Sequence, residues 1–173
     1  MSRPDEASRV VAYLQANRYH LQDTSPSWPE NYLTEEFWER QLEDNVREFE
    51  RDQSLRLFMF EKDAPEKVIG TANFTSILRK AAQFCYLGYG LDKDKQGYGY
   101  MTEGLRGAIA YVFDDMNLHR IMANYLPTNE RSANVLKRLG FRVDGYAIDY
   151  LFLNGRWRDH ILTSLSNSHW RAP

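Results

Sequence analysis

The feature that most constrains the fold is a change of hydrophobic period at about residue 55. Before it, apolar residues recur at helical spacing over residues 4–17 and again over residues 34–49. A turn-rich stretch with two prolines, residues 24–31, lies between these two predicted helices. After residue 55, segments rich in β-branched and aromatic residues predict three antiparallel strands in a meander. They are residues 55–61, 68–77 and 84–91.

The remainder of the chain predicts helices and strands in an irregular order. Helices are expected at 101–116 and 129–139, and strands at 119–126, 147–153 and 157–165. The last two strands are joined by Asn154 and Gly155, a dipeptide favoured in type I′ hairpin turns. This order predicts an α/β (α+β) fold, with a mixed, mostly antiparallel sheet flanked by about four helices. We expect one domain over residues 1–173.

Composition excludes several classes of protein. With 43% apolar and 27% charged residues, the chain has the profile of a soluble globular protein. Its net charge of −2 gives no general attraction for nucleic acid or for a membrane surface. The single cysteine, Cys85, excludes an internal disulfide, and the four histidines lack metal-ligand spacing, so no metal is expected. Neither a membrane span nor a signal-peptide core is apparent, which indicates a cytoplasmic location.

A glycine-containing segment, residues 96–102, lies between a predicted strand and a predicted helix. A Walker loop would need a Lys-Ser/Thr pair after its last glycine, and none follows here. A dinucleotide fingerprint would need its third glycine two places earlier than Gly104 and a parallel sheet. The third interpretation is a helix start whose free N–H groups bind phosphate oxygens. An ordinary tight turn explains the loop taken alone equally well.

Two ordered segments carry a resemblance to a known family. Gln96-x-x-Gly99 resembles the acetyl-coenzyme A signature of the GNAT N-acetyltransferases. The segment from Asn129-x-x-Ser132 to Leu-Gly-Phe141 resembles the second signature of that family. Residues 84–89, 119–125 and 154–160 resemble the branch that modifies the amino termini of ribosomal proteins, and the likeness runs from about residue 5 to the C-terminus. The resemblance implies a GNAT fold. It also implies transfer of acetyl from acetyl-CoA to the N-terminal α-amino group of a protein, with an alanine-initiated ribosomal protein as partner.

The resemblance also implies a set of cofactor-binding residues. The backbone of Tyr89, Gly90 and Leu91 would pair with the pantetheine arm, and for this their side chains need not be special. The residues expected at the pyrophosphate are Gln96, Gly97, Tyr98, Gly99, Tyr100, Met101 and Thr102. Met101 stands where the family usually has Gly or Ala. Asn129 would contact the cofactor near the reaction centre, although asparagine also favours helix N-caps.

The candidate catalytic residues are less sharply defined. The resemblance suggests Ser132 as the hydrogen-bond donor to the departing thiolate, while a serine bonded to the backbone of the first helical turn is the alternative. Relatives often carry a glutamate as general base where this chain has Tyr86, whose ordinary pKa of about 10 makes it a poor base. Asp149, Glu103 and a chain of waters are the other candidates. An α-amino group, with a pKa near 8, needs little help to lose its proton.

Aromatic residues are expected to border the acceptor. Trp28 and Tyr32 lie in the predicted loop between the first two helices, which borders the acceptor groove in this family. Tyr125 and Tyr150 are candidates for the same region, as is Tyr146. Packing in the core explains each of these aromatic residues as well.

One departure from the family concerns the start of the chain. Family members usually begin with a strand before the first helix, whereas this sequence begins almost at the helix. Either the sheet lacks that edge strand or the start is shortened, and a missing edge strand would expose backbone groups.

Three other functions fit parts of the sequence. The same cofactor site could serve acetylation of a small amine or an antibiotic. A catalytically weak acetyl-CoA-binding regulatory module is suggested by Tyr86 and by the missing strand. A nucleotide-binding protein would instead bind ATP or NAD through the glycine loop. The sequence does not predict the oligomeric state.

Overall fold

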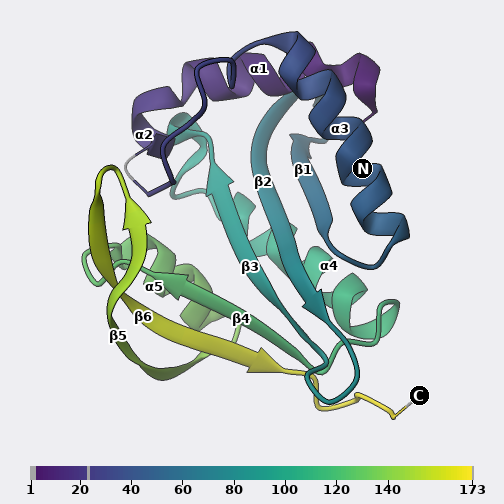
Figure 1. Ribbon diagram of the computed structural model, residues 1–173, viewed down its shortest axis with the longest axis vertical. Coiled ribbons are helices and arrows are strands. Elements are labelled where there is room, and N and C mark those ends of the chain that lie inside the picture. The colour runs from purple at the N-terminus through teal and green to yellow at the C-terminus, as the bar shows by residue number, and fades with distance from the viewer. Residues whose placement is uncertain (1–2, 23, 173) are drawn as a thin grey trace.

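A computed structural model describes residues 3–22 and 24–172 of the chain (Figure 1). Its helices are a short 3₁₀ turn η1 (Pro4–Glu6), α1 (Ala7–Ala16), α2 (Arg18–Gln22), α3 (Glu35–Glu50), a second 3₁₀ turn η2 (Lys93–Lys95), α4 (Tyr100–Asp114) and α5 (Glu130–Arg138). The four long helices coincide with those that the apolar spacing predicts. The short helix α2 was not expected, and it makes five α-helices rather than about four in the described ranges.

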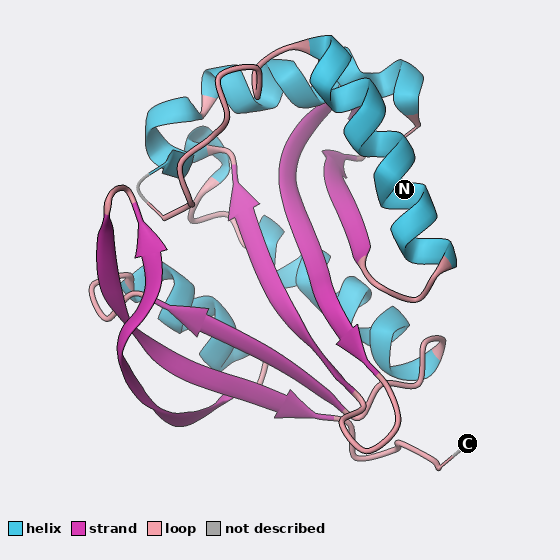
Figure 2. Cartoon of the chain, in the orientation of Figure 1, coloured by secondary structure: helices cyan, strands magenta, loops and turns pink. Residues whose placement is uncertain are grey.

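Six strands form one sheet (Figure 2). They are β1 (Leu55–Glu61), β2 (Ala64–Leu78), β3 (Phe84–Leu91), β4 (Arg120–Tyr125), β5 (Arg142–Leu153) and β6 (Arg156–Ser166). Their order in the sheet is β1-β2-β3-β4-β6-β5, and every neighbouring pair is antiparallel except β3 and β4. The predicted mixed, mostly antiparallel sheet is confirmed. No strand precedes β1 in the part of the chain that the structure describes, and β1 is an edge of the sheet.

The last hairpin differs from the prediction at one end. Asn154 and Gly155 have φ angles of 49° and 76°, as a type I′ turn requires. Strand β5, however, begins at Arg142 rather than at Ala147. The pairing with β6 shifts between Ala147 and Leu151, so the strand contains a bulge. A bulge breaks the alternation of side chains, and this hides the first half of the strand from a period-2 pattern.

Two apolar clusters cover opposite faces of the sheet. Side chains alternate along β1, so Leu57 and Met59 pack into one cluster while Phe58 and Phe60 pack into the other. The first cluster lies against α4 and α5, and the second against α1 and α3. Figure 1 likewise shows α4 and α5 behind the sheet as drawn. The sheet therefore separates α4 and α5 from α1 and α3.

The parallel strands β3 and β4 stay together over only part of their length. They pair from Phe84 with Arg120 to Leu87 with Ala123, and then they separate. Beyond this point residues 88–91 of β3 pair with β2, and the last two residues of β4 pair with β6. Figures 1 and 2 show the two strands diverging. Residues 88–91 therefore have one backbone edge that no strand covers.

Candidate active site

The loop between β3 and α4 has a backbone conformation that depends on two glycines. Gly97 and Gly99 have φ angles of 87° and 89°, in the left-handed region where other residues are strained. Gly99 caps α4 and offers no side-chain acceptor to the first turn. Within the described ranges, no N–H group of residues 96–102 donates to a protein acceptor outside the helix, and the first helical N–H groups have no intrahelical partner. Free N–H groups at a helix start, together with the helix dipole, are the kind of donor set that binds phosphate oxygens in proteins.

Side chains outside the motif hold this loop in place. Both carboxylate oxygens of Glu61, on β1, lie 2.7 Å from Lys95 Nζ, and the Tyr100 hydroxyl donates to Glu61 Oε1 at 2.8 Å. The buried Asn17 accepts from the backbone N–H of Lys93 at 2.9 Å. These contacts were not predicted, because the partners are 34 to 76 residues apart and share no motif.

Gln96 contacts the helix that the sequence did not predict. Its Nε2 lies 2.7 Å from Nε2 of His20, on α2. The sequence spacing of His20 does not suggest a metal ligand. In the structure, the partner of this histidine is the Gln96 amide. The side chain of the first motif residue thus connects the loop to the first helices rather than pointing freely into solvent.

Met101 does not disturb the loop although it stands where the family usually has Gly or Ala. Its side chain is 5% exposed and belongs to the core cluster beneath α4. Tyr98, between the two glycines, is 77% exposed, and its ring lies 6.5 Å from that of Tyr100. Thr102 follows in the first turn of α4. The Met101 side chain is therefore buried in the core and does not cover the backbone of the loop.

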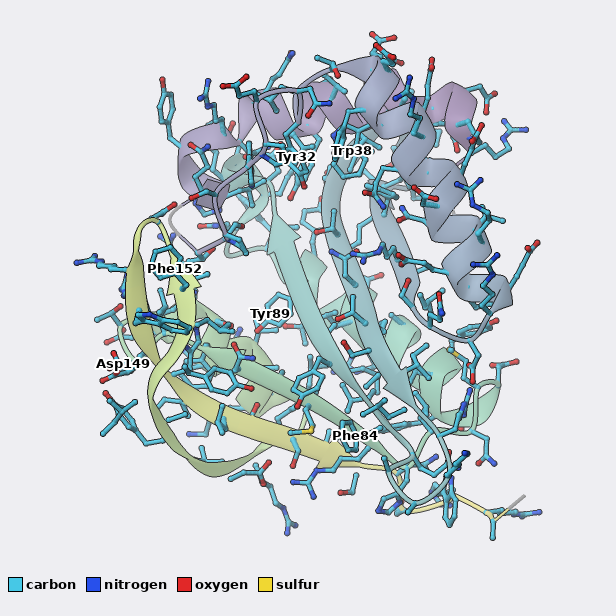
Figure 3. All side chains as sticks on the ribbon, in the orientation of Figure 1. Tyr32, Trp38, Phe84, Tyr89, Asp149 and Phe152 are labelled. Carbon is cyan, nitrogen blue, oxygen red and sulfur yellow. The ribbon has the colours of Figure 1, made fainter. Side chains whose placement is uncertain are left out.

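The second motif meets β3 at the point of divergence. Asn129 caps α5, with its side-chain oxygen accepting from Ser132 N at 3.1 Å, as its residue type predicts. The Ser132 hydroxyl lies 2.6 Å from the hydroxyl of Tyr89. The Tyr89 side chain, which the expected backbone pairing does not require, thus has a polar partner of its own. Figure 3 shows Tyr89 between β3 and β4.

The candidate bases occupy different places. Tyr86 lies on the paired part of β3, opposite Met122, with its ring 5.9 Å from Phe84. Asp149 lies in the bulge of β5 with φ 48°, its side chain exposed, and its N–H donates to Asp159. Figure 3 shows it on this outer strand, away from Tyr89. Glu103 is exposed in the first turn of α4, where a carboxylate favours the helix dipole.

The expected acceptor aromatics fall into two groups. Trp28 and Tyr32 belong to an aromatic cluster beneath α1 and α3, with ring centroids 4.8 Å apart. Burial is the main cause that raises the pKa of Tyr32, and Trp38 donates to its carbonyl oxygen (Figure 3). Core packing therefore accounts for much of their position, as the alternative interpretation held.

The second group comprises Tyr125, at the end of β4, and Tyr150, on β5. Burial and then Tyr86 raise the pKa of Tyr150, so these two tyrosines from β3 and β5 are neighbours. Tyr125 contributes to the raised pKa of Tyr89 and so lies near it. Tyr146 is more exposed, at 54%, and donates to Asp159. Tyr86 and Tyr150 thus form one pair, and Tyr89 and Tyr125, which both pack against the first apolar cluster, form another.

Metal ligands and membrane-spanning helices also bear on the class of protein. Among residues 3–22 and 24–172, no group of three or more His, Cys, Asp or Glu side chains could hold a metal ion. In the same ranges none of the helices has the length and apolar character needed to cross a membrane.

Comparison with known proteins identifies the class to which this fold and site belong. The acetyltransferase (GNAT) domain family matches residues 3–142, which is most of the chain. The protein therefore belongs to the GNAT acetyltransferase family, whose members are acetyl-CoA-dependent. Both the predicted family and the predicted fold are confirmed.

Three known proteins show which members of the family this chain resembles. The [ribosomal protein uS5]-alanine N-acetyltransferase of Escherichia coli is 41% identical over 95% of this chain and 84% of that relative. The crystal structure of the ribosomal-protein-S5-alanine acetyltransferase from Vibrio fischeri has a TM-score of 0.95 at 36% identity, covering 99% of this chain and 93% of that one. Mycobacterium smegmatis RimJ in complex with CoA-disulfide shares the fold, with a TM-score of 0.89 at 24% identity, over 99% of this chain and 82% of that one.

Proposed function

We propose that this protein transfers the acetyl group of acetyl-CoA to the N-terminal amine of a protein, with an alanine-initiated ribosomal protein as acceptor in the cytoplasm. The observation that carries the proposal is the parting of β3 and β4 beside a loop of free N–H groups. The uncovered edge of β3 can pair with a linear chain that contains amide groups. The free N–H groups of the loop can bind a pyrophosphate. Acetyl-CoA has both parts, and no metal is needed in this scheme.

Each part of the cofactor has a proposed partner. The backbone from Tyr89 to Leu91 pairs with the pantetheine arm, and the N–H groups from Gly97 to Thr102 bind the pyrophosphate. Asn129 and Ser132 begin α5 at the divergence of the strands, so they face the thioester end. The Ser132 hydroxyl donates a hydrogen bond to the departing thiolate.

The acceptor amine must attack in its neutral form. An α-amino group has a pKa of about 8, so an appreciable fraction is already neutral at cellular pH. Tyr86, Asp149, Glu103 and water remain the candidates for receiving its proton. Tyr86 lies nearest to the divergence of the strands, whereas Asp149 is exposed on the outer strand. Tyr125 and Tyr150 flank the amine, with Trp28 and Tyr32 at the outer wall.

The names of the most similar relatives support alanine as the first residue of the acceptor. Two relatives at 41% and 36% identity are named for alanine, whereas a ribosomal-protein-serine acetyltransferase of Escherichia coli is 29% identical over 83% of this chain. A spermidine N(1)-acetyltransferase of Vibrio cholerae is 27% identical over 75% of the chain. A small polyamine is therefore the appropriate competitor in an assay.

The test uses matched peptides that differ only in their first residue. The full chain is incubated with acetyl-CoA and peptides beginning with alanine, serine or methionine, or with spermidine. Thiol release gives the rate, and mass spectrometry locates the acetyl group. We expect the alanine peptide to be modified at its α-amino group with the highest kcat/KM. Turnover of spermidine without turnover of any peptide would overturn the proposed acceptor.

A further inference from the structure

Tyr89 and Ser132 form a hydroxyl pair where β3 and β4 diverge. Their hydroxyl oxygens are 2.6 Å apart, and the Tyr89 oxygen also lies 3.2 Å from the Ser132 carbonyl oxygen. Both residues are half-buried, and 43 positions of sequence separate them. A strand and the first turn of a helix thus bring two hydroxyl groups together beside the free edge of β3 (Figure 3).

Each hydroxyl of this pair has a single proton, which limits the hydrogen bonds that the pair can donate. Each hydroxyl has one proton to donate and can also accept. Asn129 binds the N–H of Ser132 and not its hydroxyl, and among the described residues Tyr89 is the partner of that hydroxyl. The Tyr89 proton can be donated to Ser132 Oγ at 2.6 Å or to the Ser132 carbonyl oxygen at 3.2 Å. When it is donated to the nearer Oγ, the Ser132 proton is left for a third group.

We propose that Tyr89 is a positioning residue that acts through Ser132. Its phenol donates to Ser132 Oγ and so turns the serine proton toward the sulfur of the departing coenzyme A, an inference that rests on the proposed function. During transfer the amine nitrogen bonds to the carbonyl carbon, the C–S bond breaks, and the sulfur leaves with the electron pair. The proton that the amine loses balances the proton that the thiolate gains, so both hydroxyls end the cycle protonated.

The surroundings of Tyr89 keep it a donor. Burial raises the pKa of Tyr89 to about 12, with a smaller increase from Tyr125 and an opposing effect of the bond to Ser132. A thiol has a pKa of about 8.5, so the thiolate that forms does not remove the tyrosine proton. The phenol therefore orients the serine hydroxyl throughout the reaction.

Four variants and one control test this arrangement. Tyr89→Phe, Ser132→Ala, the double variant and Ser132→Thr are compared with Tyr111→Phe, which alters an exposed tyrosine of α4 outside the site. We measure kcat and KM with the acceptor that the wild type turns over fastest, the Kd of coenzyme A by calorimetry, and the thermal midpoint.

The expected pattern is specific to action through Ser132. Tyr89→Phe lowers kcat about fivefold to tenfold, as for loss of one hydrogen bond, without changing the Kd of coenzyme A. Ser132→Ala lowers kcat about a hundredfold, as for loss of a donor to developing charge. The double variant is no slower than Ser132→Ala alone, Ser132→Thr recovers part of the rate, and Tyr111→Phe matches the wild type.

Three results would overturn the inference. They are an unchanged kcat in Tyr89→Phe, a double variant whose loss is the product of the two single losses, and a weakening of coenzyme A binding equal to the loss in kcat/KM. Acetylation of small amines alone by the wild type would overturn the proposed acceptor instead. The Tyr89 comparison would then be made with that amine.

Discussion

At the scale of single residues, Glu61 joins strand β1 to the cofactor loop, residues 96–102. It binds Lys95, just before the loop, and Tyr100, within it. The hydrogen bond from Lys95 is the main cause that lowers the pKa of Glu61 below its ordinary value of 4.5, followed by the bond from Tyr100. The charged carboxylate therefore favours the folded state.

The substitution Glu61→Gln keeps the shape of the side chain but removes its charge. Because the folded pKa lies below 4.5, the charged pair stabilises the protein above that pH and is lost as pH falls through the folded pKa. We expect wild type to exceed Glu61→Gln in unfolding free energy at neutral pH, with the difference shrinking once the pH falls below the folded pKa, which lies below 4.5. Urea unfolding across this range measures it. A difference that stays constant into acid would contradict the role of the charge.

The site residues that could be predicted are those with local signals. Gly97 and Gly99 are needed for a left-handed backbone, and Asn129 is an ordinary cap three residues before a bonded N–H. The Tyr89–Ser132 and Gln96–His20 contacts join residues 43 and 76 positions apart. Such pairs depend on how strands and helices are placed in space, which residue periodicity does not encode.

At the scale of elements, the spacing between β2 and β3 depends on one glycine. A Cβ atom added to Gly70 would lie 2.8 Å from the carbonyl oxygen of Gly90, which is backbone. Gly90 belongs to the stretch of β3 whose other edge is free, so the clash would displace the strand proposed to pair with pantetheine. In contrast, a Cβ atom on Gly107, in α4, meets nothing within 4 Å.

These two glycines give a matched pair of substitutions. Gly70→Ala is expected to lower the unfolding free energy by about 1–3 kcal/mol, since the crowded atom is main chain. Gly107→Ala is expected to raise it by about 0.5–1 kcal/mol, because alanine is the better helix former. Urea unfolding measures both. Equal stability of the two variants would show that the sheet yields freely at Gly70. Calorimetry with coenzyme A should also show weaker binding for Gly70→Ala alone.

Elements were predictable where their pattern is unbroken. Strands β1 and β3 have the predicted bounds, because apolar and aromatic residues recur along each of them from end to end. The start of β5 was missed because a bulge interrupts its alternation, and α2 because five residues are too few to show a helical period. Of these two missed elements, α2 bears directly on the site, because it carries His20, the partner of Gln96.

At the scale of the whole molecule, the first helices and the last hairpin close against each other. Asn154, in the turn between β5 and β6, donates from Nδ2 to the carbonyl oxygen of Gln22 at 2.7 Å. Gln22 ends α2, and the chain then leads to the loop that carries Trp28 and Tyr32. Figure 1 shows the hairpin tip beside α2. This contact joins the two walls proposed to border the acceptor.

Asn154→Gly removes that contact while retaining the turn, because glycine accepts the positive φ of a type I′ turn. We expect the KM for a peptide acceptor to rise about twofold to tenfold, as for one lost hydrogen bond, with the Kd of coenzyme A unchanged.

Asn117→Gly provides the control for this last prediction. Asn117 also has a positive φ, of 48°, and its side chain likewise bonds a distant carbonyl oxygen, that of Arg171, at 3.0 Å. Its contacts are with the C-terminal segment rather than with α2 or the hairpin. Asn117→Gly loses at least as much as Asn154→Gly, because the Asn117 side chain also accepts from the Arg171 N–H at 3.5 Å. General loosening of the fold would therefore raise KM in both. A rise confined to Asn154→Gly locates the acceptor between α2 and the hairpin, and an equal rise in both would exclude that role for the contact.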